Sequence, residues 1–505
     1  MRCALSAFEA GNEIDVGVSA AKTAPDGERL GDAVAKTAPL RSRLGNAGLG
    51  NAGLGDAVAR RRMQLTLAEI VQFTGSSTAV GDQLISEWSI DTRTLRPGAL
   101  YIPIRGEHHD GHSFLQDAAE RGAAAALVDE REWAEAPGMR LIRVADTLIA
   151  LQQLARRARA KLRFPMIGIT GSAGKTSTKE AIAVLIGATR NEGNLNNHIG
   201  LPLSLVRMEE TATAGVLEMG MNHAGEIRFL CDIARPDIGV VTNAGTAHIE
   251  NFASIEGVAL AKRELIEELG FKGTAVLNYD DSRVRAFGVV HAGRTITYGI
   301  GEGAGVRAEN VELTAFGAVF QIQKVPFEIH LPGLHGVSNV TAGVAVGCSL
   351  GIPVEQMAEA ARTLRNGKMR GERLTHNGIT ILNDCYNSNP EAARAMLDTL
   401  AAIPGGRKIA VLGEMLELGA WSEQLHREAG AHAAALGIDV VIAICGDARH
   451  LADAAKQGGA ESLFFDEPGD AGDALRALAR SGDAVLCKGS RGTRVEIALE
   501  RFMAD

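Results

Sequence analysis

The chain has 505 residues, which is long enough for about three domains of ordinary size. Hydrophobic residues make up 46% and charged residues 22%, a composition that excludes a chain disordered throughout. The formal net charge is −9, so broad electrostatic attraction to polyanions is excluded and no nucleic-acid partner is expected. Any phosphate site in this protein must depend on a local arrangement of residues.

Residues 1–62 have the composition of a low-complexity extension. Ala-Lys-Thr-Ala-Pro occurs at 21–25 and again at 35–39, and Gly-Asn-Ala-Gly-Leu occurs twice in tandem at 45–54. The segment has one aromatic residue and no helical or strand-like periodicity, so it could not offset the entropy cost of ordering. It also lacks the apolar core of a signal peptide, and its recurring acidic residues argue against an organelle transit peptide. We predict a disordered extension, with Met63 as a candidate start.

Residues 63–163 are predicted to form a small α/β domain. A helix is expected to begin after Met63, because Thr66 is a suitable N-cap and Glu69 follows it by three residues. A basic helix that ends before Pro165 marks the boundary with the next domain.

From about residue 164, short apolar runs alternate with helical patterns. This order is typical of a parallel β-sheet built from βαβ units. The strand-like runs are 166–170, 214–219, 238–242 and 274–278. Residues 164–366 are therefore predicted to form a central α/β domain.

A second series of the same kind follows the basic, glycine-containing segment 365–371, which we interpret as a hinge. Its strand-like runs are 379–382, 408–412, 440–444 and 484–487, and helical patterns cover 390–402 and 422–436. Residues 367–505 are predicted to form a second α/β domain.

A glycine loop follows the first strand of the central domain. It comprises Thr170, Gly171, Ser172, Ala173, Gly174, Lys175 and Thr176. Small residues let backbone N–H groups face phosphate oxygens, Lys175 can reach the terminal phosphates, and Thr176 can bind Mg²⁺. The strict pattern has glycine five positions before Gly174, where this chain has Ile169, so the loop is a variant. It predicts a nucleoside triphosphate site, and a chance glycine turn is the disfavoured alternative.

The loop resembles the Thr-Gly-x-x-Gly-Lys-Thr of the ATP-dependent Mur ligases. Longer motifs similar to that family occur in one order at 193–202, 217–227, 383–390 and 411–419, and matches extend from about 64 to 503. The resemblance implies an α/β protein of three domains. These are a central P-loop ATPase-like parallel sheet, a smaller N-terminal substrate domain and a C-terminal Rossmann-like ligase domain.

Within the family, the longer motifs are most similar to the member that joins D-alanyl-D-alanine to UDP-N-acetylmuramoyl-tripeptide. The resemblance implies ATP and Mg²⁺, an acyl-phosphate intermediate, and a role in cytoplasmic peptidoglycan precursor synthesis. The six cysteines are scattered without a Cys-x-x-Cys pair, which fits a reducing cytoplasm. No stretch of ~18 apolar residues is present, so stable membrane insertion is not expected. We expect a monomer.

The resemblance also implies the metal and catalytic groups. Glu218 and His248 stand where the family holds a second Mg²⁺, and Lys262 aligns with a lysine that is carbamylated in related ligases. With Thr176 these residues form the implied metal set, and Lys175, His248 and Lys262 are the implied catalytic groups. From the residues alone, Glu218 as a helix cap, His248 as a surface residue and Lys262 as a solvated helix lysine are the simpler interpretations.

Three further residues are implied to contact the nucleotide. Asn339 matches a family asparagine near the adenine, although the more usual position is occupied here by Gly336. Arg370 is implied to meet the γ-phosphate and Asp384 the nucleotide. The nearby Arg373 leaves the first of these assignments open, and a linker arginine is the alternative.

The substrate-binding residues implied by the resemblance lie in all three domains. The UDP-sugar is assigned to Asp91, Thr92 and Arg93, in place of the usual Asp-Ser-Arg, and to Arg105, Gly106, Asp110 and His112. The muramoyl group is assigned to Asn196 and Asn197, and the incoming dipeptide to Tyr386, Asn387 and Asn389. A turn made by Asn-Ser-Asn-Pro is an equally good account of the last group.

Other functions remain as alternatives. A UDP-muramoyl-dipeptide ligase that adds the third amino acid usually carries Asp-Asn-Pro-Arg, which is absent here. A folylpolyglutamate synthetase would share the loop but not the 91–112 segment. A P-loop nucleotide switch would need a guanine-reading Asn-Lys-x-Asp element, and none is found. A pure binding module is disfavoured because phosphate, metal and closing-domain features occur together.

Overall fold

The computed structural model describes residues 62–134, 137–314 and 317–504. The prediction for residues 1–62 lies outside these residues, apart from Arg62. Helix α1 (Leu67–Thr74) begins as the sequence predicts. The Thr66 hydroxyl accepts from the Glu69 backbone N–H at 3.1 Å, and the Glu69 carboxylate accepts from the Thr66 N–H at 2.8 Å. The predicted capping box is confirmed.

The first sheet has four parallel strands in chain order. They are β3 (Trp88–Ser89), β4 (Leu100–Tyr101), β5 (Ala125–Val128) and β6 (Arg140–Arg143). A separate antiparallel pair joins β1 (Leu65–Thr66) to β2 (Leu84–Ile85), and the helices are α2 (Leu115–Glu120) and α3 (Thr147–Lys161). The small α/β fold expected for this part of the chain is confirmed.

The central sheet has seven strands, all parallel, in the order β13-β12-β11-β10-β7-β9-β8. The predicted runs appear as β7 (Met166–Thr170), β9 (Gly215–Glu218), β10 (Ile238–Val241) and β11 (Thr274–Asn278). The strands that the sequence did not predict are β8 (Thr189–Arg190), β12 (Arg294–Gly299) and β13 (Val306–Arg307). Because β7 lies between β9 and β10, the loops that follow these three strands meet at one edge of the sheet.

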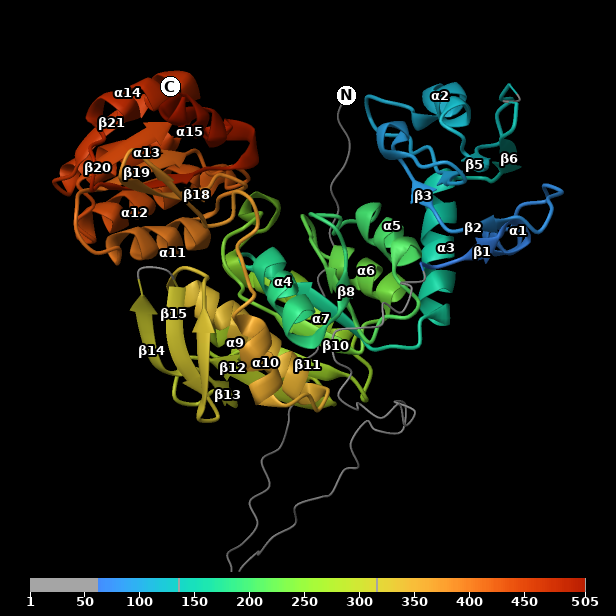
Figure 1. The fold of residues 1–505 in the computed structure, drawn as a ribbon, viewed down its shortest axis with the longest axis horizontal. Coiled ribbons are helices and arrows are strands. Elements are labelled where there is room, and N and C mark those ends of the chain that lie inside the picture. Colours follow the sequence, from blue (N-terminus) through green and yellow to red (C-terminus); the bar gives the residue numbers. More distant parts are fainter. Residues whose placement is uncertain (1–61, 135–136, 315–316, 505) are drawn as a thin grey trace, which may run out of the picture. The chain divides into compact units, whose positions relative to one another are not determined.

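Helices cover both faces of this sheet (Figure 1). The helices of this part of the chain are α4 (Lys175–Ile186), α5 (Gly200–Arg207), α6 (Glu226–Ala234), α7 (Ile255–Glu267), α8 (Ser282–Ala286), α9 (Gly333–Ser349) and α10 (Val354–Ala361). Ile167 and Ile169 of β7 pack in the same cluster as Ile182 of α4, whereas Met166 packs in the cluster that contains Leu265 of α7. Burial on both faces explains why the strand sequences are continuously apolar.

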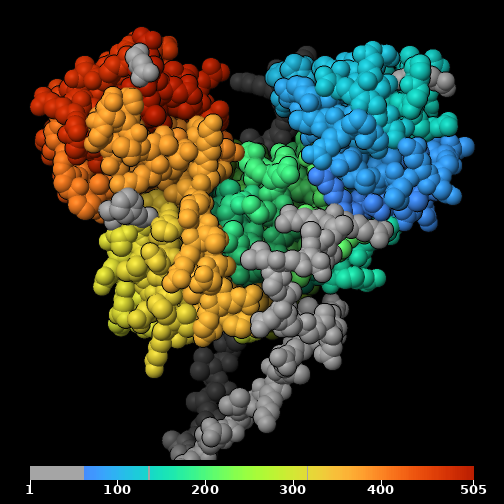
Figure 2. Space-filling model, in the orientation of Figure 1, coloured from blue at the N-terminus to red at the C-terminus, as the bar shows by residue number. Residues whose placement is uncertain are grey.

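A three-stranded antiparallel sheet follows that the sequence analysis missed. Its strands are β14 (Glu309–Thr314), β15 (Gly317–Ile322) and β16 (Val325–Ile329). The hairpin between β15 and β16 turns at Gln323 and Lys324, which both have positive φ, of 51° and 67°. Such a turn usually carries Asn-Gly or Asp-Gly, so the usual sequence signal is missing. Part of this sheet, in yellow, reaches the surface seen in Figure 2.

The C-terminal sheet has the order β17-β18-β22-β19-β20-β21. Its strands are β17 (Glu372–His376), β18 (Ile379–Asp384), β19 (Lys408–Gly413), β20 (Val440–Ile444), β21 (Glu461–Phe465) and β22 (Ala484–Lys488). Only β17 pairs antiparallel, as an edge strand. The helices are α11 (Pro390–Ala401), α12 (Ser422–Ala435), α13 (Ala448–Gln457), α14 (Pro468–Leu478) and α15 (Val495–Met503). The predicted Rossmann-like fold is confirmed.

Within the described residues, we find no helix with the length and apolar character needed to span a bilayer.

The packing of α12 on α13 gives a first prediction. Gly430 of α12 lies so close to the backbone carbonyl of Leu451 in α13 that an alanine Cβ would overlap it. We expect Gly430→Ala to lower the free energy of unfolding by about 1–3 kcal/mol, because the two helices would have to separate. Urea unfolding compares it with Gly469→Ala, a control position where a Cβ meets no atom within 4 Å. Equal unfolding midpoints for the two variants would contradict the expectation.

Candidate functional site

The glycine loop connects the buried strand β7 to the first turn of α4. Gly171 has φ of 154° and Gly174 has φ of 80°, values that side chains other than glycine rarely adopt. A Cβ at Gly171 would also overlap the Thr242 hydroxyl, which belongs to the end of the neighbouring strand β10. The loop therefore requires glycine at this position for both conformational and steric reasons.

Asn243, which the sequence analysis did not single out, forms hydrogen bonds with the backbone of the glycine loop. Its side-chain oxygen accepts from the Ala173 N–H at 2.8 Å, and its amide nitrogen donates to the Ala173 carbonyl at 3.0 Å. The Ser172 N–H donates to the Asn243 carbonyl at 3.2 Å. Asn243 follows β10 directly, in Val-Thr-Asn-Ala-Gly, so an asparagine just after a buried strand was the available signal.

The two residues predicted to act on phosphate groups lie at the start of α4. The Lys175 ammonium donates to the Gly171 carbonyl at 2.7 Å, so it lies over the loop. Burial lowers the pKa of Lys175, and the positive charge of Arg370 lowers it further, whereas Glu218 and Glu417 oppose this. An arginine from the C-terminal part of the chain is thus close enough to interact with the loop lysine.

Glu218 is the last residue of β9 and is only 2% exposed. One carboxylate oxygen accepts from the Thr176 hydroxyl at 2.7 Å, and the other accepts from the Asn196 amide at 2.8 Å. The interpretation of Glu218 as a helix cap is wrong, since both of its partners here are side chains. Asn197, by contrast, uses its side-chain oxygen locally, accepting from the Gly200 N–H at 2.8 Å at the start of α5.

His248 lies in the turn after β10, with a positive φ of 63°. Its Nδ1 is 2.5 Å from a carboxylate oxygen of Glu417, which follows β19 in the C-terminal sheet. The hydrogen bond from His248 lowers the pKa of Glu417, although burial acts in the opposite direction. Across the residues with described positions, no three His, Cys, Asp or Glu side chains form a metal cluster.

Lys262 is on α7 and is only 1% exposed. Its ammonium makes no hydrogen bond or ion pair with any described residue. Burial and the neighbouring Lys175 charge place the pKa of Lys262 well below its usual range, although Glu391 opposes them. The interpretation of Lys262 as a solvated helix lysine is therefore wrong.

The C-terminal residues predicted to meet the nucleotide are held by partners within their own part of the chain. The Arg370 guanidinium lies 3.7 Å from the centre of the Tyr386 ring. Asp384 accepts from the Lys488 ammonium at 2.6 Å, and the same ammonium donates to the Asn387 carbonyl at 2.8 Å. Lys488 ends β22 and was missed by the sequence analysis, although Lys-Gly-Ser after an apolar strand was a usable signal.

The start of α11 contacts the loops of the central sheet. Asn389 caps α11 by accepting from the Ala392 N–H at 2.9 Å, and its amide donates to the Ser172 carbonyl at 3.0 Å. Glu391 accepts from the Thr246 N–H at 2.7 Å and from the Thr246 hydroxyl at 2.9 Å. Asn389 thus has a structural role, but as the N-cap of α11 rather than in the turn that the sequence suggested, and it also reaches the glycine loop. Glu391 was not predicted.

Asn339 and Arg373 differ in their relation to the loop. Asn339 is buried on α9 and accepts from the Thr178 hydroxyl of α4 at 3.0 Å, so its side-chain oxygen faces the loop helix. Arg373 lies in β17, opposite Leu382 of β18.

The residues predicted to bind the UDP-sugar form two groups. In the first, Asp91 caps the 3₁₀ turn at Thr92–Thr94 and pairs with the Arg93 guanidinium at 2.6 Å, and Thr92 is buried. In the second, the Asp110 carboxylate accepts from His112 at 2.6 Å and from Arg105 at 3.3 Å. Within the described residues no hydrogen bond or ion pair joins one group to the other.

Two residues outside the prediction complete the second group. Arg131 donates to Asp110 at 2.8 Å and pairs with Asp129 at 3.0 Å. Although burial acts to raise it, the hydrogen bonds from Arg131 and Trp133 hold the pKa of Asp129 at about 2. Arg105 also donates to Asp129, at 2.5 Å. The group is therefore a charged network on the first sheet.

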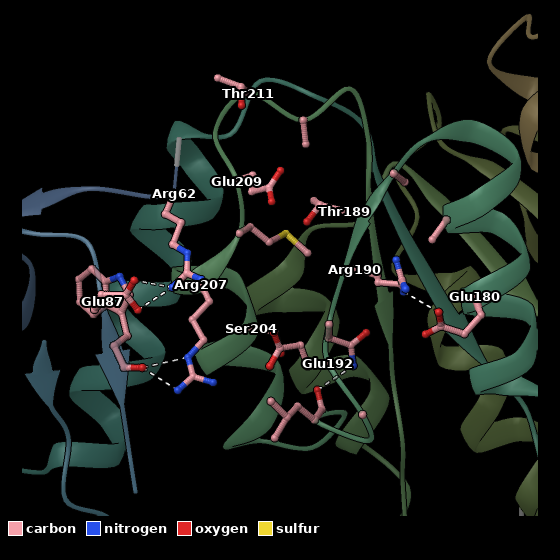
Figure 3. Close-up of a pocket in the computed structure, with 18 of the residues that line it drawn as sticks. Arg62, Glu87, Glu180, Thr189, Arg190, Glu192, Ser204, Arg207, Glu209 and Thr211 are labelled. Atoms are coloured by element: carbon pink, nitrogen blue, oxygen red, sulfur yellow. Dashed lines mark hydrogen bonds and ion pairs between the residues drawn. The ribbon is translucent and has the colours of Figure 1, made fainter. Parts of the chain in front are cut away.

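A large cavity of about 1080 Å³ lies beside the Asp91 turn, and Figure 3 shows it. Its lining includes Ser89, Thr94 and Arg96 from the N-terminal segment, together with residues 191–193 and 195. The lining holds four arginines and four glutamates, so its formal charges balance. Arg62 pairs with Glu87 at 2.6 Å and Arg190 with Glu180 at 2.6 Å. The cavity is thus polar rather than strongly positive.

The geometry of the glycine loop gives a second prediction. Gly171→Ala should weaken nucleotide binding by at least about tenfold, because the new Cβ would displace the loop from Thr242 and turn its N–H groups away. Titration calorimetry with ADP measures this. The control is Gly187→Ala at the other end of α4, which has a similarly positive φ of 66° but open space around it. Equal affinities for the two variants would argue against the loop as the nucleotide site.

The buried amine of Lys262 gives a third prediction. Because its folded pKa is lowered, the unfolded chain binds a proton that the folded chain lacks between that pKa and about 10.4. Lys262→Met should therefore be more stable than the parent at pH 7, and the difference should shrink as the pH approaches 10. Urea unfolding in bicarbonate-free buffer at the two pH values tests this, with the exposed Lys272→Met as control. A difference that is the same at both pH values would refute it.

Comparison with known proteins places these features in a family. Residues 84–159 match the model described as Mur ligase family, catalytic domain. Residues 169–347 match the Mur ligase middle domain, and residues 369–491 match the domain described as Mur ligase, glutamate ligase domain.

Two curated relatives share the same printed name, UDP-N-acetylmuramoyl-tripeptide–D-alanyl-D-alanine ligase. The Bacillus subtilis protein is 36% identical over 446 residues, which cover 86% of this chain and 97% of the relative. The Escherichia coli protein is 33% identical over 394 residues, which cover 76% of this chain and 86% of the relative.

Solved structures agree with this relationship. A crystal structure of MurF from Acinetobacter baumannii is 28% identical, with a TM-score of 0.78, and the match covers 87% of this chain and 99% of that one. The structure of MurF ligase from Thermotoga maritima in complex with ADP is also 28% identical, with a TM-score of 0.72, and the match covers 83% and 97%. This chain belongs to the Mur ligase family.

Proposed function

We propose that this protein is an ATP-dependent ligase that joins D-alanyl-D-alanine to UDP-N-acetylmuramoyl-tripeptide in peptidoglycan precursor synthesis. The observation that carries the proposal is the glycine loop at the edge of the central sheet, where Thr176 meets Glu218 and the start of α11 touches the loop. Relatives at 33% and 36% identity that bear the name of this activity support it.

In the first step, the terminal carboxylate of the tripeptide attacks the γ-phosphorus of ATP. A new carboxylate–phosphorus bond forms, the bond to the bridging oxygen breaks, and ADP leaves. Lys175 lies over the loop and neutralises negative charge as it shifts toward the bridging oxygen. We assign the γ-phosphate contact to Arg370 rather than Arg373, because the charge of Arg370 acts on Lys175 and Arg373 lies in β17.

The donors around Glu218 fit Mg²⁺. The Thr176 hydroxyl and the Glu218 carboxylate oxygen are 2.7 Å apart, and hard oxygen donors are the ligands that Mg²⁺ prefers. Bound there, Mg²⁺ would neutralise charge on the phosphate oxygens. His248 and a carbamylated Lys262 would complete the set that the family resemblance implies. The buried, unpaired amine of Lys262 supports the modification, because a neutral amine can add carbon dioxide and release a proton to give a carbamate.

In the second step, the amine of D-alanyl-D-alanine attacks the carbonyl carbon of the acyl phosphate. An amide bond forms, phosphate leaves, and the nitrogen loses a proton. Asn389 and Glu391 fasten the start of α11 to the loops at Ser172 and Thr246, which would shield the acyl phosphate from water. The substrate roles assigned to Asp91, the Asp110 group, Asn196 and Tyr386 remain predictions. The monomeric state and the cytoplasmic location also remain predictions.

A ligation assay gives the fourth prediction. ADP should form rapidly only when ATP, UDP-N-acetylmuramoyl-tripeptide and D-alanyl-D-alanine are all present, and mass spectrometry should detect the joined product. Parallel reactions with the diaminopimelate and lysine tripeptides identify the accepted third residue.

Two controls separate the alternatives. UDP-N-acetylmuramoyl-dipeptide with diaminopimelate tests for the ligase that adds the third amino acid, and GTP in place of ATP tests for a nucleotide switch. Equal ADP formation with either peptide withheld would contradict the proposed reaction.

A further inference from the structure

Lys179 is a fully buried lysine on α4, one turn after Lys175. Its ammonium donates to the Asn191 carbonyl at 3.0 Å and to the Gly193 carbonyl at 2.8 Å. Both carbonyls belong to the segment between β8 and α5, which we call the 191–197 loop. The proposed ligase reaction assigns no role to this lysine.

The side chain of Asn191 also stabilises the 191–197 loop. The Asn191 side-chain oxygen accepts from the Glu218 N–H at 3.0 Å, and its amide donates to the Leu195 carbonyl at 3.0 Å. These bonds tie the loop to the end of β9. The same loop carries Asn196, whose amide donates to the Glu218 carboxylate at 2.8 Å.

Burying an ammonium group is costly unless its hydrogen bonds and charge are satisfied. Lys179 meets this requirement through the two loop carbonyls and through nearby carboxylates, at 3.6 Å to Glu180 and 4.0 Å to Glu218. Both carbonyls lie outside the helices and strands, so they take no part in a regular backbone hydrogen-bond ladder. Lys179 supplies the hydrogen-bond donors for them. The lysine therefore bridges the loop helix, the loop itself and the carboxylate at the end of the strand.

We propose that Lys179 is a positioning residue, which holds the 191–197 loop by the carbonyls of Asn191 and Gly193 and thereby keeps Asn196 on Glu218. Residues 191–193 and 195 also line the large cavity, where Figure 3 labels Glu192 and the Glu180–Arg190 ion pair beside it. One buried amine thus sets both the surroundings of Glu218 and one wall of the cavity.

A purely structural lysine and a positioning lysine give different results on substitution. Lys179→Met keeps most of the side-chain length and volume but removes the N–H donors and the charge. If Lys179 only fills space, the 191–197 loop should be as well ordered in this variant as in the parent. If Lys179 holds the loop, the loop should open while α4 and the sheet remain folded.

Hydrogen–deuterium exchange on the ligand-free protein is the fifth prediction. Lys179→Met should raise the exchange rate of amides in residues 191–197, and of the Glu218 amide that donates to Asn191, by about tenfold or more. The amides of α4 and of residues 215–217 in β9 should exchange as in the parent. Lys272→Met, which removes an exposed lysine in the turn before β11, should leave the loop unchanged. Loop exchange in Lys179→Met within twofold of the parent would overturn the proposal.

Lys179→Gln decides the point if the methionine variant is poorly folded. Glutamine keeps a polar donor in the same space but is shorter, so it cannot serve both carbonyls. Faster exchange of the 191–197 loop supports the proposal, and unchanged exchange overturns it. Neither measurement uses substrate or nucleotide, so both remain decisive even if the protein has no ligase activity.

The activity readout rests on the proposed function. Lys179→Met should lower kcat/KM for the UDP-muramoyl substrate by about tenfold or more, with a melting temperature close to that of the parent. Because Lys179 acts through Asn196, the kcat/KM of the double variant with Asn196→Ala should be no lower than that of the less active single variant. Losses that multiply in the double variant would show that Lys179 does not act through Asn196, and would overturn the proposal.

Discussion

The hydrogen bond between Thr176 and Glu218 is the contact on which the rest of the site depends. It joins the first turn of α4 to the end of β9, and so connects the phosphate-binding loop to the sheet. Glu218 is almost fully buried, and a carboxylate in that position is stable only when its oxygens are satisfied. Thr176 and Asn196 satisfy them, and Lys179 and Asn191 fix the loop that carries Asn196. The result is one connected set of polar groups behind the glycine loop.

Contacts from the C-terminal sheet meet the same edge of the central sheet. Asn389, Glu391 and Glu417 all follow strands of the C-terminal sheet, and they contact Ser172, Thr246 and His248, respectively. In parallel sheets the carboxyl ends of the strands carry the functional loops, so two such sheets can present their loops to each other. This arrangement supports a reaction in which one part of the chain holds ATP and another admits the acceptor.

An element could be predicted from the sequence when its own residue pattern reflects its burial, and was missed when residues distant along the chain decide its surroundings. Strands such as β7 and β10 were found because both faces are buried and their sequences are continuously apolar. The sheet β14–β16 was missed because β14 is largely exposed and the turn at Gln323 lacks the usual glycine. Lys262 gave no sign of its burial, because a lysine in a helical pattern is usually exposed and only the surrounding elements decide otherwise.

The fold class, the glycine loop and its order relative to the longer family motifs could be predicted from the residues alone, because these features depend on residues that are close along the chain. The tertiary structure was needed to show which polar groups meet. Thr176 and Glu218 are 42 residues apart, and Asn389 reaches Ser172 across 217 residues. It also decided that Lys262 lies unpaired in the interior and that Lys179 turns toward the 191–197 loop. The physical reason is that burial and hydrogen-bond partners are set by strand order and helix packing, which no local pattern of residues records.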